Sequence, residues 1–365
     1  MNFNHSYLRA VRVLLFPFSV LYYCIVWCRN RLYDKKVFAS AQFNMPVICV
    51  GNLSLGGTGK SPMVEYLMRL LHQDFPVATL SRGYKRKTKG YALANQNTSV
   101  LDIGDEPMLF HIKFPDVAVT VGEERLVAIP QLLHDRPGTR VIIMDDAFQH
   151  RAVRAGLNIL LSDCKNLFTR DWYLPTGNLR DEKQSCRRAD IIVVTKCNAD
   201  MTPQQQDEYR REISPLPHQH LFFSAIRYGK PYHIIHHTNY LIGSAVEVLL
   251  ITGIANPKPL QEYLQHHAGS CHQLSFNDHQ IFTIDDLKDM IKKFEAIPSR
   301  MKIMLTTEKD AVRLAKFESI IKDLPFYVIP IEQTFLFNGA GSFNTLIKNF
   351  IENFSNTGSP AYHET

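Results

Sequence analysis

Residues 51–61, which read GNLSLGGTGKS, constrain the fold of this 365-residue chain more than any other segment. They directly follow the apolar run 47–50 and precede a helical pattern over residues 63–71. A phosphate-binding loop requires glycines that expose backbone N–H groups, a helix amino terminus facing the anion, a lysine for the terminal phosphates and a hydroxyl for Mg²⁺. All four features coincide here, which favours a P-loop over a glycine-rich turn that merely packs.

The match is a variant P-loop, because Ser54 stands where the common pattern has glycine. We expect Lys60 to bind the terminal phosphates of a nucleotide and Ser61 to bind its Mg²⁺. The predicted nucleotide-binding residues are Ser54, Leu55, Gly56, Gly57, Thr58, Gly59, Lys60 and Ser61.

Continuous apolar runs separated by helical segments predict the surrounding fold, because strands buried on both faces are typical of parallel sheets covered by helices. The runs of the first series are 47–50, 77–80, 117–120, 141–144, 157–160 and 191–194. A turn-rich segment after about residue 225 introduces a second series at 246–251, 302–305 and 326–329. We therefore expect an α/β protein with a P-loop NTPase-like, mostly parallel sheet, helices on both its faces, and a second, smaller α/β domain.

The amino-terminal segment 13–28 carries no charge and is flanked by basic residues. It is shorter than the about 20 apolar residues that comfortably cross a bilayer, and it contains Pro17. A short transmembrane helix, a helix lying in the membrane interface and a buried core helix all remain open. The flanking cations, which favour contact with anionic lipid headgroups, are Arg9, Arg12, Arg29, Arg31, Lys35 and Lys36.

These patterns divide the chain into four expected parts. They are an apolar membrane-associating helix at 1–40, a P-loop core domain at 41–228, a smaller α/β domain at 229–350 and a carboxyl-terminal tail at 351–365.

The composition excludes several classes of protein. The 41 Lys and Arg against 35 Asp and Glu leave a formal net charge of +6, and 45% hydrophobic residues is ordinary for a globular protein. The seven cysteines form no CxxC pair, so we expect a reducing cytoplasm and neither structural zinc nor a disulfide scaffold. The basic residues are scattered without interleaved aromatic residues, so no nucleic-acid partner is predicted.

The strand at 141–144 ends in two carboxylates, Asp145 and Asp146. A nucleotide-bound Mg²⁺ needs an oxygen ligand at such a strand end, and we predict that Asp145 is that ligand beside Ser61. An aspartate at a strand end is also common as a cap or turn former. Asp146, Gln149 and His150 follow at a spacing that keeps them near the same sheet edge, although spacing alone does not assign their roles.

The chain resembles the tetraacyldisaccharide 4′-kinases of lipid A biosynthesis along nearly its whole length. The motifs that carry the resemblance are GNLSLGGTGKSP (51–62), SRGYKRKTKG (81–90), GDEP (104–107), DDAFQH (145–150), LPTGNLR (174–180), TGIANP (252–257), Asp278-His279 and TEKDAVRL (307–314). The chain departs mildly from the family pattern, with Ala147 for the usual glycine and Ser61 for a frequent threonine.

The resemblance implies a lipid kinase that transfers the γ-phosphate of ATP to the 4′-hydroxyl of a lipid A disaccharide 1-phosphate. ATP and Mg²⁺ are the implied cofactors, and the glycolipid and the membrane surface are the implied partners, with no obligate protein partner predicted. The expected location is the cytoplasmic face of the inner membrane, reached through the amino-terminal helix.

The resemblance also implies the proton-transfer residues. The catalytic aspartate of the family lies in the GDEP motif, which points to Asp105, with His279 as its partner in a dyad beside Lys60. From the residues alone, Asp105 could equally cap the helix that Glu106-Pro107 begins, and His279 could be solvated or capping in a His-rich region.

Acceptor binding should use positive charge, because the resembled substrate carries a 1-phosphate. Arg82 lies in a basic loop that follows a strand, at the edge where α/β sheets bind ligands, although such loops are often merely solvated. Arg180 matches a family motif, and Arg125 is a further candidate. The predicted substrate-binding residues are Asn52, Arg82, Asp146, Gln149, His150, Arg180 and Asp181.

A P-loop GTPase or metallochaperone-type regulator at the membrane is the alternative function, since it would share the loop and the strand-end aspartate. Guanine recognition requires an Asn-Lys-x-Asp element after a late strand, and residues 195–198 read TKCN there. Asn198 thus replaces the discriminating aspartate, which favours the kinase.

Overall fold

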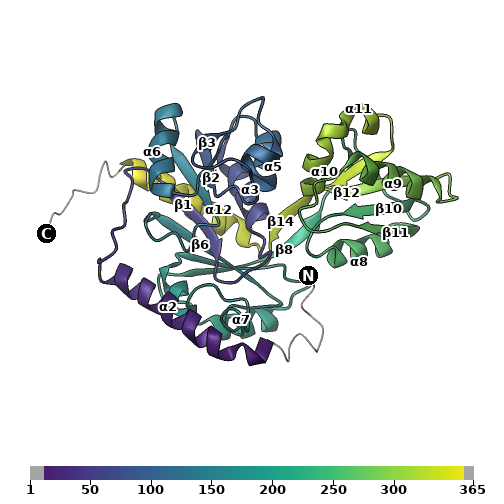
Figure 1. The fold of residues 1–365 in the computed structure, drawn as a ribbon. Helices are drawn as coiled ribbons and strands as arrows, with labels where there is room; N and C mark the ends of the chain where they lie inside the picture. The colour runs from purple at the N-terminus through teal and green to yellow at the C-terminus, as the bar shows by residue number, and fades with distance from the viewer. Residues whose placement is uncertain (1–11, 357–365) are drawn as a thin grey trace.

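The computed structural model describes residues 12–356, and its largest element is a nine-stranded sheet (Figure 1). Its strands, in spatial order, are β14 (Ile331–Phe335), β8 (His220–Tyr228), β7 (Ile191–Thr195), β6 (Leu157–Asp163), β1 (Val47–Asn52), β5 (Val141–Asp145), β2 (Val77–Ser81), β4 (Ala118–Val121) and β3 (Ala92–Leu93). Neighbouring strands are parallel except at the two edges, where β14 is antiparallel to β8 and β3 is antiparallel to β4. The expected mostly parallel α/β sheet is therefore confirmed.

Helices cover both faces of this sheet, because its central strands bury side chains on both sides. One face packs against α3 (Lys60–Leu71), α5 (Asp105–Lys113) and α12 (Gly339–Asn356). The other face packs against α6 (Arg125–Asp135) and α7 (Pro203–Ile213). Two short helices, α4 (Val100–Ile103) and the 3₁₀ helix η1 (Lys183–Arg188), lie in the connections. We call this unit the large lobe.

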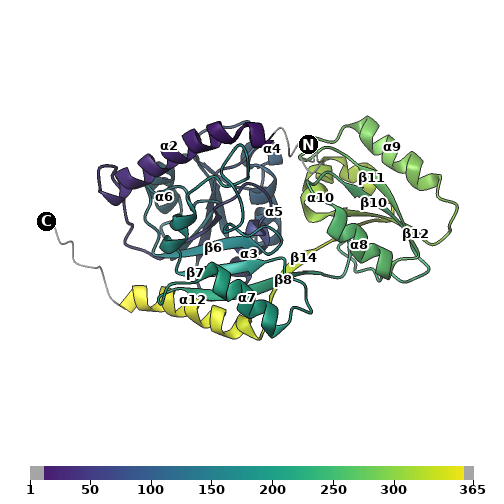
Figure 2. The ribbon, with the colours of Figure 1, turned by 90° about the horizontal axis from the view of Figure 1, so that it is seen from below.

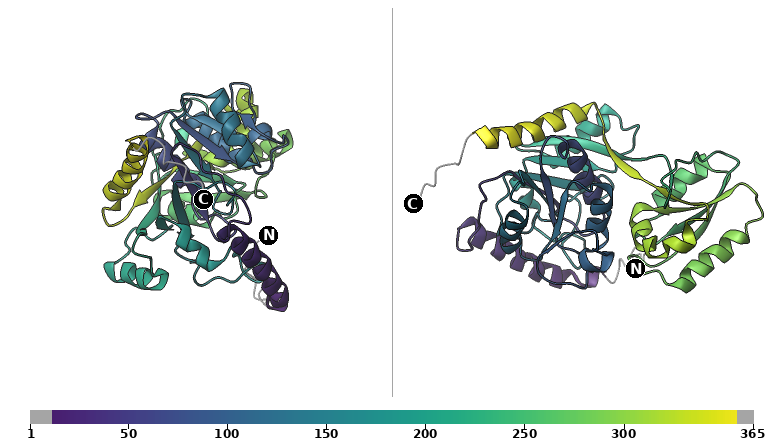
Figure 3. Two further views of the ribbon diagram at one scale, coloured as in Figure 1. Left: turned by 90° about the vertical axis from the view of Figure 1, so that its left-hand side faces the viewer. Right: turned by 90° about the horizontal axis from the view of Figure 1, so that it is seen from above.

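Residues 229–330 form a second α/β unit, the small lobe, which stands beside the large lobe in Figure 3. Its five strands, in spatial order, are β11 (Ser270–Ser275), β10 (Glu247–Thr252), β12 (Lys302–Thr307), β13 (Phe326–Ile329) and β9 (Tyr232–His233). The core on one face of this sheet includes α8 (Lys258–His267). The core on the other includes α9 (Ile284–Glu295), α10 (Glu308–Leu314) and α11 (Glu318–Ile321), with the 3₁₀ turn η2 (Ala315–Phe317) between the last two.

The chain crosses between the lobes twice, once after β8 and once before β14, and the two crossings are paired through Gly229 N and Pro330 O at 2.9 Å (Figure 2). The expected boundary at residue 350 is wrong, because β14 returns to the large lobe and pairs with β8. The expected tail from 351 is also shorter, since α12 continues to Asn356 and fully buries Ile351 in the large-lobe core. Residues 357–365 lie outside the described residues.

The amino-terminal helix α2 (Phe16–Asp34) lies along the large lobe, on the side opposite α12 (Figure 2). The side chains that α2 turns inward are mostly polar. Ser19 bonds the Tyr173 carbonyl at 3.1 Å, and Tyr22 bonds the Arg180 carbonyl at 3.0 Å. Within residues 12–356, no helix combines the length and apolar character needed to cross a membrane, and the flanking Arg9 falls outside that range.

Candidate active site

The loop between β1 and α3 has the backbone conformation of an open cradle. Gly56 and Gly59 have φ values of +104° and +85°, which L side chains rarely adopt, and nothing lies within 4 Å of where a Cβ on Gly56 or Gly57 would stand. Leu55 N donates to Asn178 O at 2.7 Å, and Thr195 Oγ1 donates to Thr58 O at 2.8 Å. The loop is thus anchored on two sides while its centre stays accessible, as phosphate binding requires.

Lys60 is the first residue of α3, and its Nζ lies 3.5 Å from Asn52 Oδ1 and 3.7 Å from Asp146 Oδ1. Burial lowers the pKa of Lys60, while the charge of Asp146 opposes that shift. Arg180 completes the cluster by donating to both carboxylate oxygens of Asp146, with Nη1 3.2 Å from Oδ2. Asp146 itself has φ +50°, a strained conformation that clusters at functional sites.

Asp145 ends β5 beside this cluster, and its side chain fits a metal ligand. Among the described residues, no hydrogen-bond partner reaches its buried Oδ1. Burial, and next the charge of Asp146, raises the pKa of Asp145 to about 6. A buried oxygen without a partner at a strand end, next to the P-loop, suits a hard cation such as Mg²⁺, and half-buried Ser61 supplies a second oxygen from α3.

The structure brings Asp105 and His279 together from the two lobes. Asp105 is the first residue of α5, after Gly104, and its Oδ2 lies 2.7 Å from His279 Nδ1. Arg313 of α10 donates to the same oxygen through Nη2 at 2.6 Å. Burial opposes ionisation of Asp105, but the hydrogen bonds from His279 and Arg313 outweigh it and lower the pKa of Asp105 to about 2.

The cap position before α5 belongs to Gly104, so Asp105 does not have the capping role that the sequence left open. His279 is half-buried with φ +61°, and its ring packs edge-on against Tyr84 at 5.5 Å between ring centroids. A non-glycine residue held at positive φ, with its ring fixed by a carboxylate and an aromatic side chain, indicates a position selected for geometry.

Besides Arg180, three predicted substrate-binding residues, Asn52, Gln149 and His150, belong to the surroundings of Asp146. Gln149 Nε2 donates to Asn52 O at 2.7 Å, and Asn52 itself is fully buried, so its side chain supports the loop. Burial, followed by the charges of Arg125 and Arg82, lowers the pKa of His150 to about 4, which keeps it neutral. Arg82 is exposed.

Two other candidates are buried by contacts within the protein. Asp181 is 1% exposed and accepts hydrogen bonds from Asn30 and Arg188, so it anchors α2 rather than facing the Lys60 cluster. Arg180 and Asp181 are neighbours in the chain, but the Arg180 side chain bonds Asp146 while the Asp181 side chain bonds Asn30 of α2. Arg125 is 2% exposed and donates to the backbone oxygens of Gly122 and Asp145, so the structure does not present it to an anion.

Sequence reasoning missed the part that α10 plays in the site. Lys309 Nζ lies 2.7 Å from Glu106 Oε1, and Arg313 contacts Asp105, so two residues four apart on one helix face meet the first two residues of α5. The sequence did carry one signal, because Lys309 and Arg313 are four residues apart and so lie on one face of a helix. No property of the sequence alone places that helix against α5.

Comparisons with known proteins agree with this geometry. A family model described as "Tetraacyldisaccharide-1-P 4'-kinase" matches residues 11–352. Tetraacyldisaccharide 4'-kinase of Phocaeicola vulgatus is 42% identical over 345 residues, covering 92% of this chain and 94% of the relative. The enzyme of that name from Flavobacterium johnsoniae is 42% identical over 355 residues, covering 94% of this chain and 98% of the relative.

Among solved structures, LpxK from Aquifex aeolicus in complex with ATP has the same fold, with a TM-score of 0.73 and 30% sequence identity. The match covers 93% of this chain and 99% of that one.

Proposed function

This chain belongs to the tetraacyldisaccharide 1-phosphate 4′-kinase family, and we propose that it transfers the γ-phosphate of ATP to the 4′-hydroxyl of a tetraacyldisaccharide 1-phosphate in lipid A biosynthesis. The observation that carries the proposal is the arrangement at one edge of the large sheet. There the P-loop with Lys60 and the Asp145 oxygen, which has no hydrogen-bond partner within residues 12–356, lie beside α5, whose first residue Asp105 contacts His279.

Each side chain then has a role that its surroundings support. Lys60 binds the terminal phosphates, and Ser61 with Asp145 would hold Mg²⁺, which when bound offsets charge on the transferring phosphoryl group. Arg180 and Asp146 keep the cluster around Lys60 in position. Arg82, exposed at the same sheet edge, is the candidate for the 1-phosphate of the acceptor.

The proton of the acceptor hydroxyl goes to His279. An ionised Asp105 can only accept at Oδ2, so the 2.7 Å contact requires a proton on His279 Nδ1. In neutral imidazole this leaves Nε2 as the acceptor nitrogen, while a carboxylate whose pKa is about 2 is a poor proton acceptor at neutral pH. Asp105 therefore orients the imidazole and stabilises it once it becomes charged.

The test is a transfer assay with detergent-solubilised protein, Mg²⁺, γ-labelled ATP and a tetraacylated disaccharide 1-phosphate. We expect labelled glycolipid with the label at the 4′ position. Absence of transfer, together with hydrolysis of GTP by the same sample, would overturn the proposal in favour of a P-loop GTPase.

Membrane association through α2 is a second part of the proposal, with the cytoplasmic face of the inner membrane as the location. The helix buries polar Ser19 and Asn30, while Phe18, Leu21 and Ile25 are 59–60% exposed on its outer face. A surface helix in contact with water instead buries its apolar side chains and exposes its polar ones. The outward apolar stripe, with exposed Lys35 and Lys36 just beyond the helix end, suits a helix lying in the interface of an anionic membrane.

Replacing Leu21 and Ile25 together with serine should reduce binding to vesicles of phosphatidylethanolamine and phosphatidylglycerol at least about tenfold, because each apolar side chain loses its transfer free energy into lipid. Co-sedimentation with the vesicles measures the effect. The matched control is the Leu241→Ser/Met301→Ser variant, which removes two exposed apolar side chains from the small lobe. Equal vesicle binding by both variants and the unchanged protein would contradict membrane association through α2.

A further inference from the structure

We propose that Arg313 of the small lobe is a positioning residue, which holds Asp105 aligned with His279 so that the reactive pair is complete only while α10 is docked on α5. The inference rests on the proposed function. It assigns to the small lobe a direct part in preparing a residue of the large lobe for phosphoryl transfer.

One nitrogen of the Arg313 guanidinium is hydrogen-bonded within the small lobe. Its Nη1 donates to Asp310 Oδ1 at 2.9 Å and to Gly253 O at 3.1 Å. Asp310 is fully buried and is held in turn, because its Oδ2 accepts from Gly253 N at 3.1 Å and from Thr307 Oγ1 at 2.8 Å. The Arg313 side chain is 4% exposed, so its direction is set by these contacts rather than by solvent.

The other side of the guanidinium reaches across to the large lobe. Arg313 Nη2 and His279 Nδ1 both lie within hydrogen-bond distance of Asp105 Oδ2, at 2.6 and 2.7 Å, and the two nitrogens are 3.4 Å apart. Asp105 Oδ2, Arg313 Nη2 and His279 Nδ1 therefore form a triangle of mutual contacts. Without the guanidinium, Asp105 would keep its buried position, lose its strongest charge partner and become able to rotate away from the imidazole.

Charges of both signs face Asp105 from the elements packed around it. Those groups are His279, Arg313, Lys309, Asp310 and the neighbouring Glu106, and Asp278 Oδ2 lies 3.8 Å from Nε2 of His279. Burial raises the pKa of Asp105, and its hydrogen bonds to His279 and Arg313 reverse that shift. Removal of Arg313 should therefore raise the pKa of Asp105, and the Asp105–His279 pair should bind a proton at higher pH.

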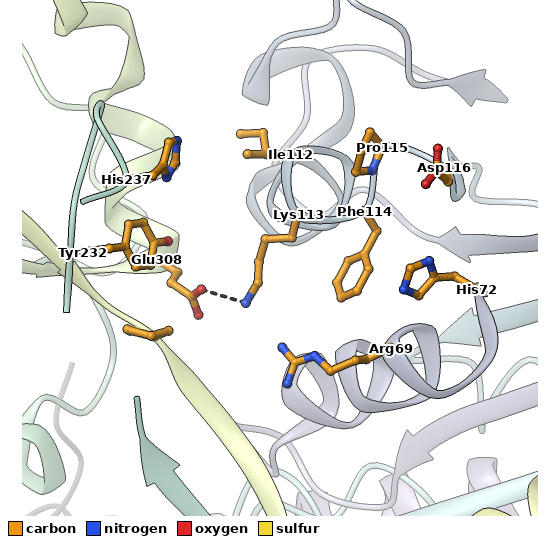
Figure 4. Close-up of a pocket in the computed structure, with 11 residues that line it drawn as sticks. Arg69, His72, Ile112, Lys113, Phe114, Pro115, Asp116, Tyr232, His237 and Glu308 are labelled. Atoms are coloured by element: carbon orange, nitrogen blue, oxygen red, sulfur yellow. Dashed lines mark hydrogen bonds and ion pairs between the residues drawn. The ribbon is translucent and has the colours of Figure 1, made fainter. Parts of the chain in front are cut away.

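Docking of the lobes has supports that do not involve Asp105. Glu308, the first residue of α10, accepts from Lys113 Nζ at 2.7 Å, and Lys113 also pairs with Glu65 of α3 at 2.5 Å. This junction lies beside a cavity of about 490 Å³ between the lobes, where Figure 4 shows Lys113 reaching from α5 to Glu308. Glu308→Gln removes the ion pair with Lys113, while the Lys309–Glu106 and Arg313–Asp105 contacts keep α10 docked on α5, so it serves as the matched control for Arg313.

The experiment compares Arg313→Met, Arg313→Lys and Glu308→Gln with the unchanged protein over a range of pH. For Arg313→Met we expect kcat about 10²-fold lower, KM for ATP within about threefold, and the acid limb of kcat/KM for the glycolipid at least about half a pH unit higher. Arg313→Lys keeps the charge and should recover part of kcat and of the acid limb. Glu308→Gln should leave the acid limb unchanged.

An unchanged acid limb in Arg313→Met, or the same kinetics in Glu308→Gln, would overturn the proposal and leave Arg313 a docking residue. Thermal unfolding accompanies each assay; if Arg313→Met does not fold, the acid limbs of Arg313→Gln and Arg313→Lys decide the question in the same way. Failure of the unchanged protein to transfer phosphate would instead count against the proposed function, so the two failures are distinguishable.

Discussion

Replacing Lys60 with alanine should lower γ-phosphate transfer by about 10³-fold or more while the protein stays folded. The Nζ group lies 3.5 Å from Asn52 Oδ1 and 3.7 Å from Asp146 Oδ1, and Asp146 keeps its ion pair with Arg180 when the lysine is removed. The stability of the fold therefore changes little. The transferring phosphoryl group, by contrast, loses the one P-loop side chain that carries a positive charge. Initial rates in the transfer assay and thermal unfolding of the same samples measure the two effects.

The matched control is Lys348→Ala, which removes a lysine on α12 that pairs with Asp74 at the surface. It should transfer phosphate at the unchanged rate. Undiminished transfer by Lys60→Ala would exclude Lys60 from phosphate binding. Unfolding of Lys60→Ala at a much lower temperature would show instead that the lysine stabilises the loop.

Features that depend on neighbouring residues in the chain could be predicted from the sequence. The P-loop is a local pattern, and the apolar runs before Gly51 and Asp145 mark strands that are buried on both faces. Each of the nine predicted runs overlaps a strand of the structure. The strands that were missed lie at sheet edges or are mixed in character: polar β11 has five side chains that are not buried, and short β3 and β9 have two residues each.

Features that depend on tertiary contacts could not be predicted in this way. The return of β14 to the large sheet has no local signal, because Ile331–Phe335 reads like the end of the preceding series until its pairing with β8 is known. The orientation of α2 is a similar case, because only contacts such as that of Asn30 with Asp181 show that this helix turns polar side chains toward the large lobe and leaves apolar ones exposed. The roles of Asp181 and Arg313 likewise depend on which way each side chain points.

Asp105→Asn should lower kcat by about 10³-fold and change ATP affinity little. The amide is neutral, so it no longer attracts the charge of Arg313 or of a protonated His279. Its NH₂ group can also donate to His279 Nδ1, which would place the imidazole proton on Nε2 and remove the accepting nitrogen. Equilibrium binding of ATP and single-turnover transfer rates separate the two quantities.

His279→Ala should lower kcat about as much as Asp105→Asn does, and the double variant should lower it little further. The reason is that two residues that act as one unit give non-additive losses of kcat. Asp285→Asn, which removes a carboxylate paired with Lys288 on the surface of α9, should transfer at the unchanged rate. Additive losses would mean that Asp105 and His279 act independently. Collapse of ATP affinity in Asp105→Asn with kcat spared would make Asp105 a metal ligand, and the assignment of Asp145 would then have to be exchanged with it.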